Sequence, residues 1–144
     1  LAPPRTQQET RMYPGIYAQK FADRPAFIMA SSGRSMSYAE LERRSNQLAH
    51  LLRGHGLQRL GHYSIFLENH FHYLETCVAG ERSGLYYTAV NSHLQPDELA
   101  YILDNSESTL LVTSAKLLDV VAHRGDMRRQ RPVAHGIVLR LEAS

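Results

Sequence analysis

The sequence has a single cysteine, Cys77, among its 144 residues, so no disulfide can form within the chain. No apolar run approaches the roughly 18 residues that a membrane-spanning helix needs. A positively charged segment followed by an apolar one, as in a secretory leader, does not open the chain either. These absences exclude a disulfide-stabilised secreted domain and a helical membrane protein, and they predict a cytoplasmic protein.

The glycine-rich signatures of nucleotide-binding proteins and serine hydrolases are also missing. The chain contains no G-x-G-x-x-G, no G-x-x-x-x-G-K-[ST] and no G-x-S-x-G. Ser31–Ser35 comes nearest to a phosphate loop, but it lacks a second glycine and a lysine and lies between two short strand candidates. Because phosphate sites form at helix N-termini, we interpret this segment as a hairpin turn.

Eight histidines raise the question of a metal site. His70 and His72 are two residues apart, which on a helix places them on different faces. Three further histidines have no partner one helical turn away: His50, His55 and His62. Cys77 lies on an apolar helical stripe with no second cysteine nearby, which favours a core residue over a nucleophile or a ligand. We therefore expect solvent-facing or capping histidines, and we assign no catalytic, cofactor-binding or metal-binding residue.

The composition, 43% hydrophobic and 21% charged, is that of a globular domain. Residues 1–12 include two prolines and no apolar periodicity, which predicts a disordered arm. Residues 123–144 hold five arginines and two acids, whereas the preceding chain is nearly neutral. A short arginine cluster without interleaved aromatic residues is typical of a solvated linker, so we expect a basic tail and no nucleic-acid binding.

Helices and strands are expected to alternate along the chain between these two ends. The expected helices are a short one from Pro14, Ser37–Arg53, one from Phe71 to Gly84, one from Pro96, and Lys116–Ala122. The expected strands are Ala26–Ala30, Ser35–Met36, Tyr63–Leu67, Leu85–Val90, Thr109–Thr113 and Ile137–Leu139. This order predicts an α/β fold with an N-terminal hairpin, followed by a partial three-layer parallel sheet with flanking helices.

The clearest helix is Ser37–Arg53, because Ser37 and Glu40 stand at the spacing of a capping box. Its apolar stripe and its polar face separate cleanly. We expect burial of Leu41, Leu48 and Leu52, and exposure of Arg43 and Arg44. The next helix is expected to bury Phe71, Leu74, Cys77 and Val78.

Five motifs occur in a familiar order: Ser37–Leu41, Ser45–Ala49, Gly61–Asn69, Gly84–Asn91 and Glu98–Ser106. Together they resemble the opening helix, the next strand with its terminal asparagine, the following strand with its valine-asparagine turn, and the next helix of adenylate-forming (AMP-binding) enzymes. That superfamily includes acyl-CoA synthetases, luciferases and adenylation domains. The resemblance runs from Tyr13 to Val121, and Leu85–Thr88 looks most like fatty-acyl-CoA ligases. Residues 13–122 are thus similar to the N-terminal portion of an AMP-binding, acyl-CoA synthetase domain.

The resemblance implies a two-step ligase that uses ATP, Mg²⁺ and coenzyme A. A carboxylic acid, here expected to be a fatty acid, attacks the ATP α-phosphate to give an acyl-adenylate and pyrophosphate, and the coenzyme A thiol then displaces AMP. In the family, the phosphate loop and the adenine-binding, hinge and lysine motifs lie downstream of the matched segment. Neither Lys20 nor Lys116 resembles the catalytic lysine.

We therefore expect a fragment of the large N-terminal domain that binds no cofactor and has no catalytic activity alone. Because the fragment supplies only about half of the helical cover that a parallel sheet needs, it is expected to leave apolar surface uncovered and to self-associate. The alternative is a non-catalytic interaction or remnant module that has retained the fold.

Overall fold

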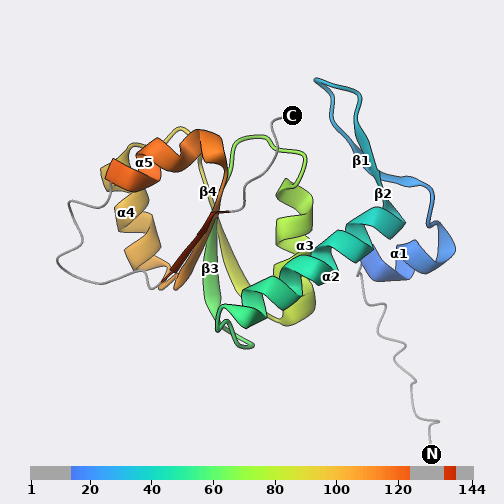
Figure 1. Ribbon diagram of the computed structural model, residues 1–144, viewed down its shortest axis with the longest axis horizontal. Helices are drawn as coiled ribbons and strands as arrows, with labels where there is room; N and C mark the ends of the chain where they lie inside the picture. The colour runs from blue at the N-terminus through green and yellow to red at the C-terminus, as the bar shows by residue number, and fades with distance from the viewer. Residues whose placement is uncertain (1–13, 124–134, 139–144) are drawn as a thin grey trace, which may run out of the picture.

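The computed structural model describes residues 14–123 and 135–138 (Figure 1). The helices are α1 (Pro14–Lys20), α2 (Tyr38–Gly54), α3 (Tyr73–Ser83), α4 (Pro96–Asn105) and α5 (Leu118–His123), with a 3₁₀ turn η1 at Ala115–Leu117. The strands are β1 (Pro25–Ile28), β2 (Ser35–Ser37), β3 (His62–Phe66), β4 (Tyr86–Val90), β5 (Leu110–Thr113) and β6 (His135–Val138). The expected arm at 1–12, most of the expected basic tail at 123–144, and Leu139 lie outside the described residues.

Four strands form a parallel sheet in the order β4-β3-β5-β6. Phe66 at the end of β3 pairs with Val90 of β4 on one side and with Thr113 of β5 on the other. Helices α2 and α3 lie against one face of the sheet, and α4 and α5 lie against the other (Figure 1). The expected α/β architecture, with a parallel sheet between helices and a hairpin before it, is confirmed.

The face of the sheet toward α2 and α3 carries the largest apolar cluster. Tyr63 and Ile65 alternate along β3 toward this face and are fully buried. Helix α2 starts where the sequence indicates, because the Ser37 hydroxyl accepts a hydrogen bond from the Glu40 backbone N–H at 3.2 Å. The expected leucine stripe is buried: Leu41, Leu48 and Leu52.

The opposite face is more polar where the strands begin. Ser64 of β3 points to this side, and its hydroxyl lies 2.8 Å from the hydroxyl of Ser108, which in turn lies 2.8 Å from that of Ser106. Further along the strands, an apolar cluster includes Phe66, Val90, Leu99, Leu103, Leu111 and Leu117. On the edge strand β4, Tyr86 is 57% exposed and faces the same side. This face is only partly covered.

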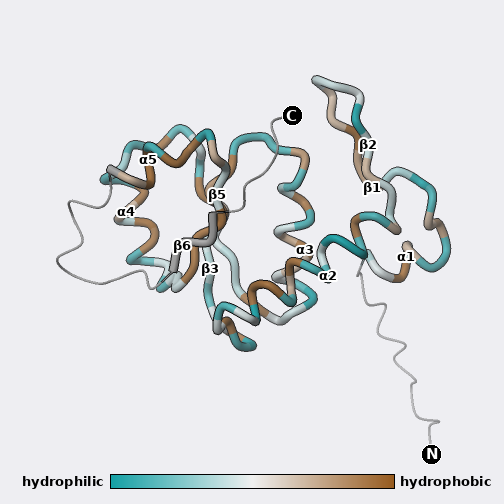
Figure 2. Tube along the Cα trace, viewed as in Figure 1, coloured by the Kyte–Doolittle hydropathy of each residue, from teal (hydrophilic) through white to brown (hydrophobic). Residues whose placement is uncertain are grey.

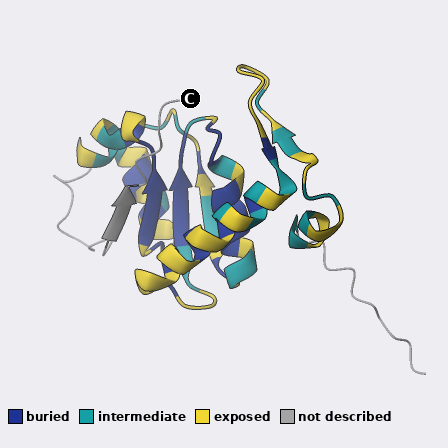
Figure 3. Ribbon diagram, turned by 45° about the vertical axis from the view of Figure 1, so that its right-hand side comes forward, coloured by how far each residue is buried: buried dark blue, intermediate teal, exposed yellow. Residues whose placement is uncertain are grey.

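The hairpin formed by β1 and β2 is a separate two-stranded sheet that stands away from the main sheet (Figure 1; Figure 3). Gly33 takes the turn at φ +69°, and Met29 and Arg34 close it with a backbone hydrogen bond of 2.8 Å. The expected hairpin turn at Ser31–Ser35 is thus confirmed. Met36 is fully buried against α2 and α3, and the colouring of Figure 2 shows apolar residues at the base of the hairpin.

Two expectations for side-chain exposure are wrong. Leu74 was expected to be buried but is 38% exposed, and Arg44 was expected to be exposed but its side chain is only 29% accessible. Leu74 lies in the first turn of α3, whose buried residues begin at Glu75 and include the expected Cys77 and Val78. Phe71 packs with the hairpin cluster. Among the described helices, none combines the length and the hydropathy required to cross a bilayer.

Candidate functional site

The strand order places a topological switch point between β3 and β5. From β3 the chain passes through α3 on one face to β4, and from β4 it passes through α4 on the other face to β5 (Figure 1). The chain leaves β3 toward α3 on one face and leaves β5 toward α5 on the other, so these two connections diverge from the β3–β5 gap at the carboxyl ends of the strands. In open parallel sheets, ligands bind outside the carboxyl ends at such a point, so this edge is the candidate functional site of the described chain.

The switch point is lined by oxygen atoms. Glu68 follows β3 and Ser114 follows β5, and the Ser114 hydroxyl donates to the Glu68 carboxylate at 2.6 Å. Ser114 occupies the N-cap position of the 3₁₀ turn, but its hydroxyl is engaged by Glu68 and does not cap that turn. Next to it, the buried Thr113 hydroxyl has no partner among the described residues. The hydrogen bond between Ser114 and Glu68 ties the ends of β3 and β5 together across the gap.

Asparagines follow two of the strands at the same edge. The Asn91 side chain, after β4, accepts a hydrogen bond from the His93 backbone N–H at 3.0 Å and so folds the turn into α4. Asn69, two residues after Leu67, is exposed. The sequence resemblance identified both asparagines, whereas the contact between Glu68 and Ser114 joins residues far apart in the chain and has no local signal.

Chemically, this edge can form hydrogen bonds to a ligand, but it does not supply an activated nucleophile. Glu68 and the two hydroxyls can accept or donate hydrogen bonds to a ligand hydroxyl or amine. In the described part of the chain, neither Ser114 nor Thr113 has a histidine or lysine as a recorded partner. The arrangement therefore holds the strand ends together and offers hydrogen-bonding groups, and neither hydroxyl is paired with a histidine or lysine base of the kind that activates a nucleophile in covalent catalysis.

The single cysteine lies in the core, as expected. Cys77 is 9% exposed within the α2–α3 cluster. Burial raises the pKa of its thiol above the ordinary value, with a smaller contribution from Glu81. A raised pKa leaves the thiol protonated and weakly nucleophilic near neutral pH. The interpretation of Cys77 as a core residue is confirmed.

His50 and His55 are exposed, as expected, but two other histidines depart from the expectation of solvent exposure. His70 and His72 are buried, although His72 does occupy the N-cap position of α3. The His72 Nδ1 lies 2.8 Å from Arg44 Nη2 of α2 and 3.1 Å from the Glu75 carboxylate of α3, and Arg44 pairs with Glu75 at 2.5 Å. This cluster joins α2 to α3. Within residues 14–123 and 135–138, no group of three or more His, Cys, Asp or Glu residues could hold a metal ion.

Comparison with known proteins gives a family match over most of the chain. A family model described as AMP-binding enzyme matches residues 16–143, so the match includes most of the arginine-rich segment. A 3-oxocholest-4-en-26-oate–CoA ligase from Rhodococcus rhodochrous is 35% identical over 95 residues, covering 66% of this chain and 17% of that ligase. Tyrocidine synthase 3 from Brevibacillus parabrevis is 30% identical over 113 residues, covering 78% of this chain and 2% of the synthase.

Solved structures show the same fold. A benzoate CoA ligase from Burkholderia xenovorans LB400 superposes with a TM-score of 0.77 at 20% identity, covering 88% of this chain and 25% of that one. A Mycobacterium tuberculosis fatty acyl CoA synthetase gives 0.76 at 18% identity, again covering 88% of this chain and 25% of that one. The chain thus spans about a quarter of these structures and about a sixth of the Rhodococcus ligase.

Proposed function

Because the chain belongs to the family of AMP-binding enzymes, we propose that it is the N-terminal portion of an ATP-dependent acyl-CoA ligase. The whole ligase would join a carboxylic acid to ATP, with release of pyrophosphate, and then transfer the acyl group to the coenzyme A thiol. The observation that supports this most is the family match over residues 16–143, on a fold shared with CoA ligases. The proposed acid is a fatty acid, because the sequence of Leu85–Thr88 resembles that of fatty-acyl-CoA ligases.

We further propose that this chain has no ligase activity alone. Adenylate formation requires positive groups and donors that stabilise the charge developing on the phosphates. In the sequence no glycine-rich phosphate loop is found, and the switch point offers a carboxylate, Glu68, which would repel a phosphate. The chain's proposed role in the ligase is to build the first strands and helices of the domain.

The direct test measures pyrophosphate release by the purified chain with ATP, Mg²⁺ and a fatty acid such as palmitate. The expected rate equals that of a heat-denatured control. A rate above that control, lost on omission of the acid, would show that the chain catalyses adenylation alone.

The gene itself provides the test of the ligase assignment. We expect the coding DNA beyond the Ser144 codon, or in another frame from His123, to encode a loop rich in serine, threonine and glycine followed by a lysine. The extended protein should then form acyl-CoA from acid, ATP and coenzyme A. If the extended reading contains no such loop, the non-catalytic interaction or remnant module becomes the better hypothesis.

A further inference from the structure

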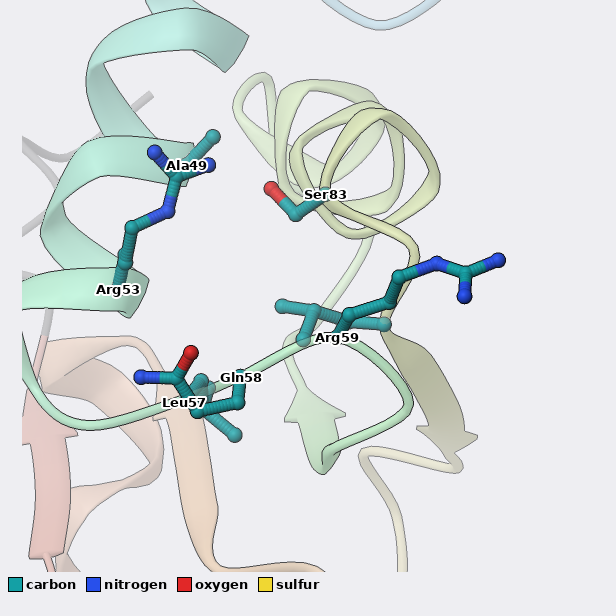
Figure 4. A pocket seen from close by; sticks show the side chains of 7 residues that line it. Ala49, Arg53, Leu57, Gln58, Arg59 and Ser83 are labelled. Carbon is teal, nitrogen blue, oxygen red and sulfur yellow. The ribbon is translucent and has the colours of Figure 1, made fainter.

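A cavity lies at the end of the sheet opposite the switch point. The C-terminal turns of α2 and α3 and the loop that leads into β3 enclose a pocket of about 170 Å³ (Figure 4). Its lining residues are Ala49, Arg53, Leu57, Gln58, Arg59, Ser83 and Leu85. Two of these are arginines and none is acidic, so the pocket is positively charged.

The two arginines of this pocket differ from the other arginines that the structure describes. The other five all have a recorded partner: Arg24 and Arg34 lie over phenylalanine rings, Arg43 bonds Gln47, Arg44 pairs with Glu75, and Arg82 pairs with Glu42. Among residues 14–123, the guanidinium groups of Arg53 and Arg59 have no carboxylate, carbonyl or ring partner. The unpaired guanidinium groups therefore belong to the two residues that line the pocket.

The C-terminal ends of two helices stabilise the arginine cations here, and their partial negative charges also reduce the positive potential of the pocket. Helices α2 and α3 both end at the pocket, at Gly54 and Ser83, and each C-terminus carries about half a negative charge. Two full positive charges outweigh these two partial charges. The pocket thus keeps a positive potential after the helix dipoles are counted, and an anion would complete the pairing.

A polar group inside the wall has no partner. The Ser83 hydroxyl oxygen is buried, and no described residue hydrogen-bonds to it. Figure 4 shows this hydroxyl directed across the pocket, toward the side on which Arg53 lies. Buried hydroxyls in native proteins are normally hydrogen-bonded, so an acceptor in the pocket would satisfy this one.

Arg59 lines the pocket with its stem. Its Cγ would lie 3.2 Å from a Cβ at residue 84, so Gly84, at φ +65°, leaves room for the stem. The guanidinium points away from the pocket in Figure 4. Because the Arg59 side chain is exposed, rotation about its side-chain bonds would bring the charge over the opening once an anion is bound.

We propose that this pocket binds a small oxyanion of the size of a phosphate group. Arg53 and the Ser83 hydroxyl would donate to it directly, and Arg59 would close over it. The volume lies below the roughly 300–1,000 Å³ of pockets for drug-sized ligands, which excludes a whole nucleotide. The ligand is therefore inorganic phosphate or the terminal phosphate of a larger ester whose remainder lies in solvent. This inference does not depend on the ligase function.

The test follows backbone amide and arginine Nε–H signals by NMR as inorganic phosphate is added to the full chain, at an ionic strength held constant with sodium chloride. We expect saturable shifts at Arg53, Ser83 and Gly84. Arg53→Gln should weaken binding by roughly tenfold, the loss of one charge-assisted hydrogen bond. Arg59→Gln and Ser83→Ala should each weaken it by a few fold. Arg43→Gln, which removes the same charge from the exposed face of α2, is the matched control and should bind as the unmodified chain does.

A second titration with glycerol 3-phosphate separates the two sources of the anion. Binding at least as tight as that of inorganic phosphate would identify an ester ligand, and weaker binding would identify the free anion. Unfolding curves for each variant confirm that the fold is retained. Shifts that do not saturate, or that respond equally to Arg43→Gln and Arg53→Gln, would overturn the proposal.

Discussion

The two faces of the parallel sheet differ in how completely they are covered. Toward α2 and α3, twelve buried residues form one cluster that continues into the hydrogen-bonded contact of Arg44 with Glu75. Toward α4 and α5, six buried residues form the cluster, the hydroxyls of Ser64, Ser106 and Ser108 lie near the beginning of the strands, and Tyr86 is mostly exposed. The difference indicates that the α2–α3 face carries most of the stability of this chain.

Truncating one leucine on each face would test that difference most strongly. Leu52 is fully buried on the α2–α3 face, and Leu117 is 9% exposed on the other. We expect Leu52→Ala to lower the free energy of unfolding by about 3–5 kcal/mol and Leu117→Ala by about 2 kcal/mol, because the partly covered site relaxes more easily. Urea denaturation measures both. Equal losses would show that the two faces contribute alike.

The tightness of the better-covered face is tested at Gly80. A Cβ at this position would collide with the ring and hydroxyl of Tyr63, which is fixed by its hydrogen bond of 2.6 Å to the Thr76 carbonyl. Gly80→Ala should therefore destabilise the chain by about 1–3 kcal/mol. Gly54→Ala is the control, since nothing lies within 4 Å of its added methyl group. In a Tyr63→Phe background the cost of Gly80→Ala should fall, and an unchanged cost would show that the hydroxyl is not the obstacle.

Alkaline pH should weaken the same face. Burial, followed by the nearby Cys77, raises the pKa of Tyr87 to about 12, and burial also raises that of Tyr63. The unfolded chain loses these protons near pH 10, while the folded chain still holds them. Stability is therefore complete below pH 10 and falls as the pH rises through 12. Unfolding midpoints measured from pH 8 to 11 should decrease above pH 10, and Tyr87→Phe should flatten that decrease. A decrease of the same slope in the variant would assign the effect to other groups.

The smallest effect on stability is expected at the open side of the sheet. Tyr86 is 57% exposed and contacts the His62 ring at a centroid distance of 5.0 Å. Tyr86→Ser should change the free energy of unfolding by less than about 0.5 kcal/mol, yet it should reduce self-association if the uncovered face mediates it. Sizing chromatography over a range of concentrations measures this. Tyr101→Ser, at a residue that is 70% exposed on α4, is the control.

The sequence predicts the elements well because their signals are local. The cap at Ser37, the leucine stripe of α2 and the turn at Gly33 each involve residues within one or two turns of each other. The alternation of strands and helices then leads to a parallel sheet without further information. Even here one residue is misplaced: Leu74 was expected on the buried stripe with Cys77 and Val78, but it is 38% exposed in the first turn of α3.

The sites could not be predicted in the same way. Glu68 meets Ser114, and Arg44 meets His72, only because separate elements pack together. In the sequence, Arg53 and Arg59 are indistinguishable from ordinary surface arginines. Only the packing of α3 shows that they line a pocket together with Ser83. Charge and hydrogen-bonding groups carry no helical or strand period, so their partners become known only with the tertiary fold.

The strand order has a consequence for synthesis of the chain. Strand β3 lies between β4 and β5, yet β5 leaves the ribosome after both β4 and α4. Nascent β3 can therefore pair with β4 early, while its other edge stays unpaired until β5 emerges. Unpaired edges recruit strands from other chains, and domains fold as they are translated. Neighbouring nascent chains on one message are thus most able to mispair in this interval, and faster translation through α4 shortens it.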